Sequence, residues 1–318
     1  MQTFTKILFG GLLLLASLSL SAQQDVQYTQ FMYNKLGINP AYAGAVESTQ
    51  FQVAARQQWL GLEDAPSSQI ATFNSSITSE GTGVGARLSR VTIGLEQQYN
   101  VEGSYAYRFP IGRGTRLGLG LTASARYFNI EYQKATPIQG GGQDIAIPGG
   151  TQSKVLPNFG AGVYIDGPSY YFGISAPRLL QNDIDLGSEE TIISRETRHF
   201  YFMGGYKIEV NDKLTLEPQM LGKYVAGAPF DADFNVTAYF GTNLFSGLSY
   251  RLGGDGSGES ASVLVGLFLN EHLSMCISYD LGLSELKDAQ SGSLELVVGY
   301  SLGGRSDAGD VVDPRDLR

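Results

Sequence analysis

The chain has 318 residues, a formal net charge of −9, 41 glycines and only 17% charged residues. The acidic balance argues against a nucleic-acid partner, which would require a basic patch. The single cysteine, Cys276, excludes an intrachain disulfide, and no stretch after the first 22 residues approaches the roughly 18 consecutive apolar residues of a membrane-spanning helix.

Residues 1–22 are predicted to be a cleaved secretory signal peptide. Lys6 supplies a short positive region, Ile7–Leu20 is apolar or small throughout, and Ser21-Ala22-Gln23 offers a small-residue cleavage site. The apolar run has about 14 residues, whereas a helix needs about 20 to span a bilayer, so an uncleaved anchor is the less favoured alternative. An exported chain without disulfides needs another source of stability, and a closed barrel provides one because it has no free sheet edge.

Residues 23–48 are predicted to form an N-terminal periplasmic or plug segment. They show no sustained alternation of apolar and polar residues, and they contain the run Asn39-Pro40-Ala41-Tyr42-Ala43-Gly44. Pro40 removes a backbone donor and restricts the conformation of Asn39. This favours an ordered loop or plug over a strand of a barrel wall.

Alternation with period two dominates residues 49–302, and Thr115–Tyr127 is the clearest case. Successive side chains of a strand point to opposite faces, so this segment predicts a strand with one apolar face and one polar or small face. A helix would scatter Arg116, Gly120 and Arg126 around its circumference. The apolar face consists of Leu117, Leu119, Leu121, Ala123, Ala125 and Tyr127.

The same pattern predicts about 14 strands, within a range of about 12–16, and a bacterial outer-membrane barrel has an even number of strands. We therefore expect an all-β fold, a transmembrane antiparallel β-barrel over residues 49–302 with an N-terminal plug or loop segment. A soluble β-sandwich is the alternative, although its strands are usually shorter. The predicted strands are 50–57, 69–77, 82–90, 100–109, 115–127, 158–165, 169–176, 199–210, 214–225, 233–240, 244–252, 261–269, 273–281 and 293–302.

Short and long connections are expected at opposite ends of this barrel, with the tight turns usually periplasmic. Long polar stretches occur at Glu131–Leu156, Arg178–Arg198 and Leu281–Gly292. Residues 303–318 follow the last strand, are polar, and are predicted to form a flexible periplasmic tail. Five links carry turn-forming residues, namely Gly112-Arg113-Gly114, Asp166-Gly167-Pro168, Asn211-Asp212-Lys213, Gly241-Thr242-Asn243 and Asn270-Glu271-His272.

Residues that could carry out chemistry are scarce. The two histidines, His199 and His272, lie far apart in the sequence, and no serine stands in the Gly-x-Ser-x-Gly frame of many hydrolases. One cysteine and no clustered spacing of histidines and carboxylates argue against a metal site. We therefore predict no catalytic, cofactor-binding or metal-binding residues and no cofactor. A barrel hydrolase that uses His199 is the enzymatic alternative.

Aromatic and charged side chains each allow two interpretations. Aromatic residues near strand ends, such as Tyr127, Tyr171 and Tyr201, are typical of the interfacial girdles of a membrane barrel, and a carbohydrate-stacking site is the alternative. Charged residues on the polar faces either line a pore or pair inside a closed lumen. These residues are Arg108, Arg116, Arg126, Glu102, Glu217 and Lys223.

Several short motifs are more specific than the strand pattern. The run Asp25-Val26-Gln27-Tyr28-Thr29-Gln30-Phe31-Met32 is followed by Asn39–Gly44 and then by Arg56-Gln57-Gln58-Trp59. These motifs resemble the opening of the PorP/SprF family of type IX secretion system membrane proteins, in which a proline is usual where Val26 stands. Later segments also resemble this family, namely Pro157–Gly162, Tyr171–Ser175, Arg198–Tyr201 with Gly205-Tyr206, Tyr279-Asp280 with Ser284, and Gly292–Glu295, where Leu294 replaces a common histidine.

The resemblance implies a non-enzymatic outer-membrane protein of the type IX secretion and gliding machinery. The implied partners are outer-membrane lipid, periplasmic ring or motor subunits of this machinery, and secreted adhesins with C-terminal sorting domains. We expect a role in secretion or surface assembly of these adhesins, and a passive diffusion channel is the alternative. The candidate partner-binding or plug residues, which either contact partners or brace the barrel mouth, are Asn39, Pro40, Tyr42, Gly44, Arg56 and Trp59.

Overall fold

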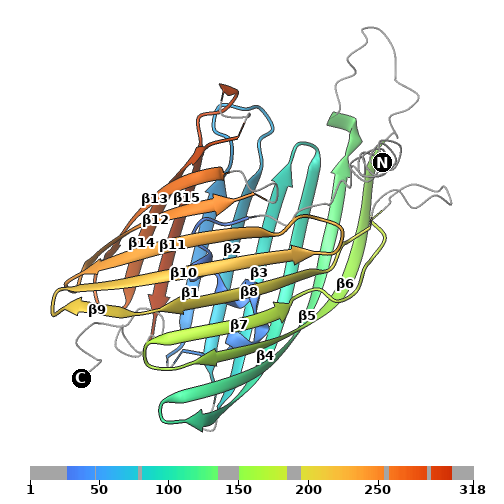
Figure 1. The fold of residues 1–318 in the computed structure, drawn as a ribbon. Helices are drawn as coiled ribbons and strands as arrows, with labels where there is room; N and C mark the ends of the chain where they lie inside the picture. The colour runs from blue at the N-terminus through green and yellow to red at the C-terminus, as the bar shows by residue number, and fades with distance from the viewer. Residues whose placement is uncertain are drawn as a thin grey trace, which may run out of the picture.

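A computed structural model describes residues 27–302, apart from residues 47, 78–80, 135–149, 185–194, 254–257 and 285–287. The predicted signal peptide and C-terminal tail lie outside these described residues. The strands form one antiparallel sheet that closes on itself, because β15 pairs with β1 and β10 pairs with β11 (Figure 1). Their bounds are β1 Gln50–Gln57, β2 Ser67–Ser76, β3 Thr82–Ile93, β4 Glu96–Gly112, β5 Thr115–Glu131, β6 Thr151–Asp166, β7 Tyr170–Ala176, β8 His199–Tyr206, β9 Ile208–Asn211, β10 Leu214–Val225, β11 Asp231–Phe240, β12 Leu244–Leu252, β13 Gly258–Phe268, β14 Leu273–Gly282 and β15 Ser293–Ser301.

The strands β8 and β9 are two halves of one barrel strand. Both pair with β10, and the register continues across the interruption, from Gly205 opposite Gln219 to Ile208 opposite Leu216; it shifts only near the end of β9, between Leu214 and Thr215. Only Lys207 separates the halves. The described residues therefore form a closed antiparallel barrel of 14 strands with one strand interrupted, which confirms the predicted fold class.

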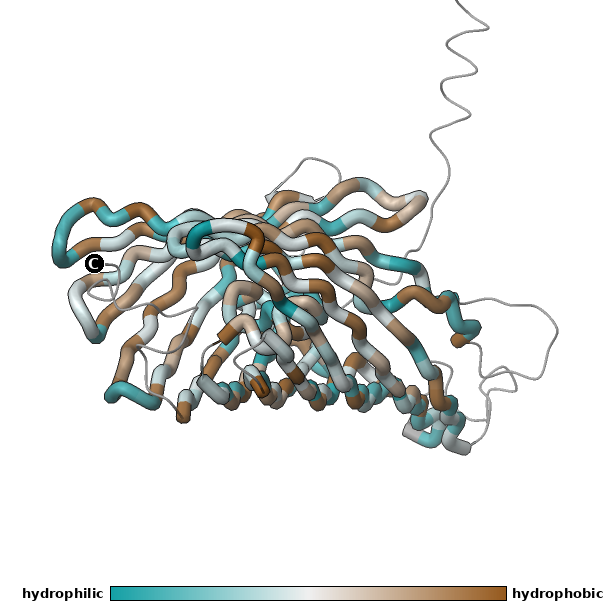
Figure 2. The backbone as a smooth tube through the Cα atoms, turned by 90° about the horizontal axis from the view of Figure 1, so that it is seen from below, coloured by the Kyte–Doolittle hydropathy of each residue, from teal (hydrophilic) through white to brown (hydrophobic). Residues whose placement is uncertain are grey.

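The alternation in the sequence becomes an alternation of exposure in the wall. In β5, Leu119 and Leu121 are 49% and 64% exposed on the outer face, whereas Gly118, Gly120 and Thr122 are buried on the inner face. Hydrophobic and polar segments alternate in the same way along the other strands (Figure 2). So large an apolar outer surface is unfavourable in water and favourable in contact with lipid, so it fits a membrane-embedded barrel.

The hairpins formed by β4, β5 and β6 extend further than the alternation predicted. The β5–β6 ladder continues to Glu131 opposite Thr151, although the sequence pattern suggested a loop over Glu131–Leu156. The antiparallel ladder between β5 and β6 holds this extension through backbone hydrogen bonds, which do not depend on the side-chain pattern. The predicted strand 158–165 therefore missed strand residues 151–157.

The connections segregate between the two ends of the barrel largely as predicted, the exception being the two-residue β3–β4 link at Gly94-Leu95, which lies at the same end as the long loops. All five short links join strands at one end, which we call the short-turn end. The longer links β1–β2, β5–β6, β7–β8 and β14–β15 join strands at the other, which we call the long-loop end. In Figure 1 the β1–β2 and β14–β15 connections rise at the top, and the β4–β5 turn lies at the bottom.

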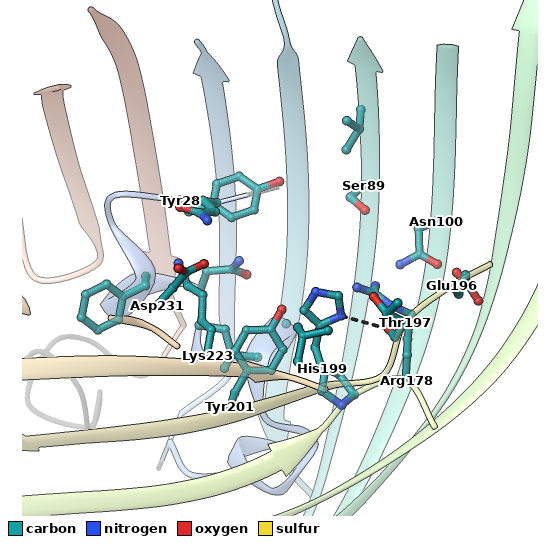
Figure 3. Close-up of a pocket in the computed structure, with 18 of the residues that line it drawn as sticks. Tyr28, Ser89, Asn100, Arg178, Glu196, Thr197, His199, Tyr201, Lys223 and Asp231 are labelled. Carbon is teal, nitrogen blue, oxygen red and sulfur yellow. Dashed lines mark hydrogen bonds between the residues drawn. The ribbon is translucent and has the colours of Figure 1, made fainter. Parts of the chain in front are cut away.

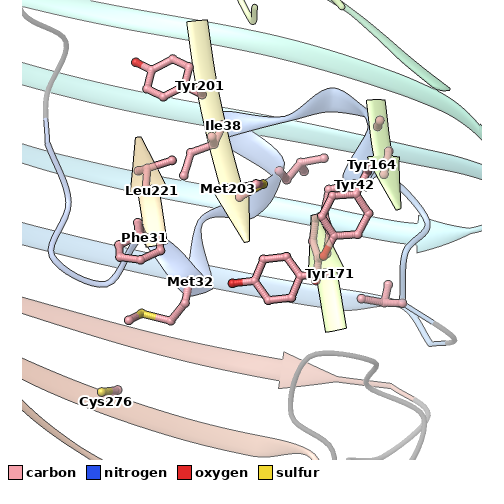
Figure 4. Packing of buried hydrophobic residues seen from close by; sticks show 14 of the residues in the cluster. Phe31, Met32, Ile38, Tyr42, Tyr164, Tyr171, Tyr201, Met203, Leu221 and Cys276 are labelled. Atoms are coloured by element: carbon pink, nitrogen blue, oxygen red, sulfur yellow. The ribbon is translucent and has the colours of Figure 1, made fainter. Parts of the chain in front are cut away.

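Residues 27–46, which we call the lumen segment, run through the inside of the barrel. They form two 3-10 turns, η1 Phe31–Tyr33 and η2 Pro40–Tyr42, on either side of the short helix α2 Lys35–Ile38. Apolar side chains of this segment pack against inward-facing side chains of the wall (Figure 4). The core of the molecule therefore lies between the lumen segment and the wall. Its members include Phe31, Met32, Ile38, Tyr42, Tyr164, Tyr171, Met203 and Leu221.

Candidate functional site

The lumen segment crosses the barrel from the long-loop end to the short-turn end. Thr29 and Gln30 contact Glu295, which lies near the long-loop end of β15. Further along, Gly44 contacts Asn74, which lies near the short-turn end of β2. The chain then enters β1 at the short-turn end, where Ser48 lies 2.6 Å from Ser301.

A buried charge network holds the first residues of the lumen segment. Arg56 donates from Nη2 to the Asp280 carboxylate at 2.6 Å and from Nη1 to the Glu295 carboxylate at 3.0 Å. The Thr29 hydroxyl donates to Asp280 at 2.6 Å and accepts a bond from Arg56 at 3.0 Å. The backbone N–H groups of Thr29 and Gln30 donate to Glu295 at 2.9 and 3.1 Å. One guanidinium and two carboxylates thus fix the start of the segment.

All three charged side chains of this network are buried. The side chains of Arg56, Asp280 and Glu295 are at most 4% exposed, so water cannot compensate a lost partner. Removing one member of a buried pair leaves an uncompensated charge, which is strongly destabilising. The three charged residues belong to β1, β14 and β15; β14 and β15 form a hairpin, and β1 lies beside β15 only because the barrel closes.

The run Asn39–Gly44 docks onto glycines of the wall. A Cβ at Gly120 would meet the backbone of Pro40 and Ala41, and a Cβ at Gly162 would meet the Asn39 amide. A Cβ at Gly83 would likewise meet the backbone of Ala43 and Gly44. Glycine is therefore required at these wall positions for the backbone of the segment to approach.

Four of the predicted site residues lie in this docked run. The Asn39 side chain accepts a bond from Ala41 N at 2.9 Å and donates to the Val163 carbonyl at 2.9 Å, and Pro40 starts the turn η2. Tyr42 packs edge-on against Tyr164, with ring centroids 5.4 Å apart. Gly44 has a φ of +67°, donates to Asn74 at 2.7 Å, and accepts a bond from Arg108 at 2.7 Å.

Lys35 is a buried cation in the middle of the lumen segment. It is 3% exposed, and its Nζ lies 3.8 Å from the centroid of the Tyr171 ring and 5.7 Å from that of Tyr42. Aromatic faces attract cations, more strongly when water is excluded. The segment is therefore fixed along its length by electrostatic as well as apolar contacts.

Trp59 lies apart from the other predicted site residues. It stands in the β1–β2 connection at the long-loop end, is 36% exposed and has a φ of +47°. Its backbone N–H donates to Ser293 at 3.2 Å, and the next residue, Leu60, donates to the Gly292 carbonyl at 2.8 Å. Arg56 therefore lies in the lumen, whereas Trp59 lies at the long-loop end.

A cavity of about 310 Å³, which we call the vestibule, lies between the lumen segment and the long-loop end. A smaller cavity of about 90 Å³ lies at the short-turn end, beside Tyr33, His272 and Ser301. Burial raises the pKa of the Tyr28 phenol at the vestibule floor, so Tyr28 is neutral. Side chains that line the vestibule are shown in Figure 3, among them Tyr28, Ser89, Asn100, Arg178, Glu196, Thr197, His199, Tyr201, Lys223 and Asp231.

Most charged residues predicted to face inward are paired. Arg108 contacts Asp166, Arg126 lies 3.1 Å from Glu196, and Lys223 lies 2.6 Å from Asp233. Glu102 pairs with Arg87 at 2.9 Å, and Glu217 accepts from Tyr239 at 3.2 Å. Arg116 differs, because its side chain is exposed at the short-turn end of β5. These contacts favour the closed-lumen interpretation over a charge-lined pore.

Two aromatic residues predicted to lie in the membrane girdle face the lumen instead. Tyr171 and Tyr201 are each 8% exposed, whereas Tyr127 is 41% exposed on the outer face. Tyr171 packs against Lys35 and Tyr164, and Tyr201 lines the vestibule. The girdle prediction is wrong for these two residues because proximity to a strand end does not determine which face a side chain occupies.

The described residues offer little for catalysis. The Nδ1 atom of His199 lies 3.0 Å from the Thr197 carbonyl, a contact that fixes the ring tautomer. Within the part of the chain that the structure covers, no group of three or more histidine, cysteine or carboxylate side chains could hold a metal ion. In the same residues, no helix is both long and apolar enough to cross a membrane.

Sequence comparison assigns the chain to a family. Residues 20–300 match a family model described as type IX secretion system membrane protein PorP/SprF. No curated protein matches the sequence.

Solved structures with a similar fold are outer-membrane proteins of low sequence identity. The TodX deltaS2S3 mutant, a monoaromatic hydrocarbon channel, has a TM-score of 0.51 at 9% identity, over 84% of this chain and 94% of that one. The toluene transporter TbuX of Ralstonia pickettii has a TM-score of 0.48 at 10% identity, over 83% and 91%. Omp33 of Acinetobacter baumannii has a TM-score of 0.46 at 10% identity, over 81% and 100%. At such identities the similarity concerns the fold alone.

Proposed function

Because the chain belongs to the PorP/SprF family of type IX secretion system membrane proteins, we propose that it is a non-enzymatic component supporting secretion or surface assembly of adhesins with C-terminal sorting domains. Its partners in this proposal are outer-membrane lipid, periplasmic ring or motor subunits of the machinery, and the adhesins themselves. The barrel serves as a rigid platform whose two ends meet different partners.

The observation that carries this proposal is the filled lumen. A passive channel needs a continuous aqueous path, and here Thr29, Lys35 and Asn39 are buried within the barrel. Charged side chains such as Arg56 and Arg108 bind the lumen segment instead of facing water. This arrangement favours a platform over the alternative of a diffusion channel.

The six candidate residues divide into two roles in this proposal. Asn39, Pro40, Tyr42, Gly44 and Arg56 hold the lumen segment in the barrel. Trp59 is the candidate for partner contact, because its side chain is partly exposed at the long-loop rim.

We expect the long-loop end to face the cell exterior, as is usual for barrels with short periplasmic turns. Ser284→Cys lies in the β14–β15 connection, and Asp212→Cys lies in a short turn; both positions are exposed. A membrane-impermeant maleimide should label Ser284→Cys on intact cells and label Asp212→Cys only after the envelope is permeabilised. Native Cys276 is 3% exposed and should contribute little background. The reverse pattern would overturn this orientation.

Deletion of the gene should remove one or a few sorting-domain adhesins from the secreted and surface proteomes. The measurement is quantitative mass spectrometry of both fractions against the parent strain. Loss of every type IX cargo would instead indicate a core component. Unchanged secretion would refute the proposed role and favour the diffusion channel.

Complementation of the deletion tests whether Trp59 contacts a partner or only stabilises the long-loop end of the barrel. Wild-type protein should restore the adhesins, and Trp59→Ala should restore less while the barrel still assembles. Leu62→Ala is the matched control, because Leu62 lies in the same connection and is similarly exposed, at 37%. Equal restoration by both variants would assign Trp59 a bracing role.

A further inference from the structure

Four neighbouring strands carry one row of outward-facing side chains near the long-loop end (Figure 1). The register of the sheet places Arg90 of β3 between Gln69 of β2 and Tyr99 of β4. Tyr99 in turn lies opposite Tyr127 of β5. All four side chains are exposed, and we call them the girdle row. They form a continuous band on the outer surface of the barrel, because residues that lie opposite each other in a sheet point to the same face.

The outward positions on either side of the girdle row differ in polarity. Toward the long-loop end, the next row consists of Ser67, Thr92 and Gln97, which are all polar. Toward the middle of the barrel, the next row contains Leu88 and Val101, which are 55% and 57% exposed. Aromatic residues on the outside of a membrane barrel mark the boundary between hydrocarbon and water. The girdle row therefore lies at the depth of the lipid headgroups.

Arg90 is a cation on this otherwise apolar outer face. It follows Leu88 by two positions and so shares its face, whereas every other arginine or lysine within the described strands stands at an inward position of the alternation. The Arg90 guanidinium lies 5.7 Å from the centroid of the Tyr99 ring. Across the residues that the structure describes, Arg90 forms no ion pair with a carboxylate. Its charge is therefore available to an external anion.

The chemistry of Arg90 suits a phosphate group. A lipid-facing arginine destabilises a barrel least at the membrane interface, where it can reach headgroups. A guanidinium presents its N–H groups in a planar fork that matches two phosphate oxygens, and the Gln69 amide opposite adds two further donors. The chain as a whole carries a net charge of −9, so attraction of an anionic lipid has to be local.

The two tyrosines beside Arg90 indicate what carries the phosphate. Tyr99 and Tyr127 are 42% and 41% exposed, and their ring centroids are 6.4 Å apart. Aromatic faces of this kind stack against sugar rings, which is the second interpretation that the sequence allowed for such residues. A phosphate attached to a sugar would meet the arginine and the tyrosines together, whereas a glycerol-linked phosphate would use only the arginine.

We propose that the girdle row binds a phosphorylated glycolipid, namely lipid A of the outer leaflet of the outer membrane. Arg90 and Gln69 hold one phosphate, and Tyr99 and Tyr127 pack against the sugar that carries it. This inference rests on the proposed function, in which the long-loop end faces the cell exterior, and deepens it by naming the lipid partner.

The test is native mass spectrometry of the purified full-length protein with defined lipids. The probes are lipid A, dephosphorylated lipid A and phosphatidylglycerol, each titrated separately. Lipid A should bind most tightly. Because charge-assisted hydrogen bonds are about twice as strong as neutral ones, Arg90→Gln should lower the affinity for lipid A roughly tenfold. Arg90 is exposed on the outer face, so the barrel should still form.

Three further variants separate the contacts. Arg113→Gln removes an exposed arginine from the β4–β5 turn at the short-turn end and should leave lipid A binding unchanged. Arg90→Lys should restore only part of the affinity, because an ammonium lacks the planar fork of donors. Tyr127→Leu keeps an apolar side chain but removes the ring, and it should weaken binding of lipid A without changing binding of phosphatidylglycerol.

Each contrary result overturns a stated part of the inference. Equal binding of lipid A by the parent protein and Arg90→Gln would overturn the site itself. Equal binding of lipid A and its dephosphorylated form would overturn the phosphate contact. If phosphatidylglycerol binds as tightly as lipid A, or if Tyr127→Leu affects both lipids alike, the assignment to a glycolipid is wrong.

These measurements are independent of the secretion role. Arg90-dependent binding of lipid A together with unchanged secretion after gene deletion would uphold this inference and refute the proposed function. Loss of adhesin delivery after gene deletion, with lipid A binding that does not depend on Arg90, would support the proposed function and refute this inference.

Discussion

Replacement of Arg56 by alanine should release the start of the lumen segment from the wall. Without the guanidinium, Asp280 and Glu295 face each other in a site from which water is excluded, and breaking such a buried network costs about 3–5 kcal/mol. That cost corresponds to an increase of roughly 10²- to 5 × 10³-fold in the undocked population. Hydrogen exchange of the Thr29 and Gln30 amides, which donate to Glu295, should accelerate by this factor.

Controls distinguish a local release from general unfolding. Arg116→Ala removes an exposed arginine and should leave exchange in residues 27–46 unchanged. Arg56→Lys should restore docking only in part, because an ammonium cannot reproduce the two-pronged contact of a guanidinium. If Arg56→Ala exchanges as slowly as the parent protein, the charge network does not hold the segment. Equally fast exchange in β5 would mean that the whole barrel has been destabilised.

Replacement of Gly120 by valine should expel the run Asn39–Gly44 from its docking surface. The new Cβ would fall on the backbone of Pro40 and Ala41, which cannot move aside as a flexible side chain could. Overpacking commonly costs about 1–3 kcal/mol, and a clash with backbone lies at or above the upper limit. The purified variant in planar bilayers should therefore show a steady ion conductance well above that of the parent protein.

Gly103→Val is the matched control for this experiment. Gly103 lies on the neighbouring strand β4, where an added Cβ meets no atom within 4 Å. This variant should conduct like the parent protein, since it changes only the outer face. Heat-modifiable migration on gels should verify that both variants form barrels. Equal conductance of the Gly120 and Gly103 variants would show that the docked run does not block the lumen.

The strands and their order could be predicted because their signal is local. A wall strand must present one face to lipid and the other to the lumen, so each segment such as Thr115–Tyr127 carries its own alternation. Turn-forming residues between segments are local as well. This is why the interrupted strand 199–210 could be recognised as one unit, even though Lys207 divides it into β8 and β9.

The candidate site could be predicted only in part. Motifs drew attention to Asn39–Gly44 and to Arg56, but nothing near Arg56 in the sequence indicates its partners. Glu295 lies 239 positions away and Asp280 lies 224 positions away. Both residues stand within segments that resemble family motifs, so that resemblance was the available signal for them. Lys35, which also holds the segment, carried no comparable signal, and the strand alternation indicated only that Arg108 stands on a polar face.

The sequence by itself determined an antiparallel membrane barrel, because period-two alternation and turn chemistry act over a few residues. Only the tertiary structure decided that the lumen is filled, that Tyr171 and Tyr201 face inward, and that Arg56 meets Asp280 and Glu295. The contacts of Arg56 depend on the pairing of β15 with β1, which lie near opposite ends of the chain. Barrel closure brings together side chains from opposite ends of the chain, and local patterns contain no record of such contacts.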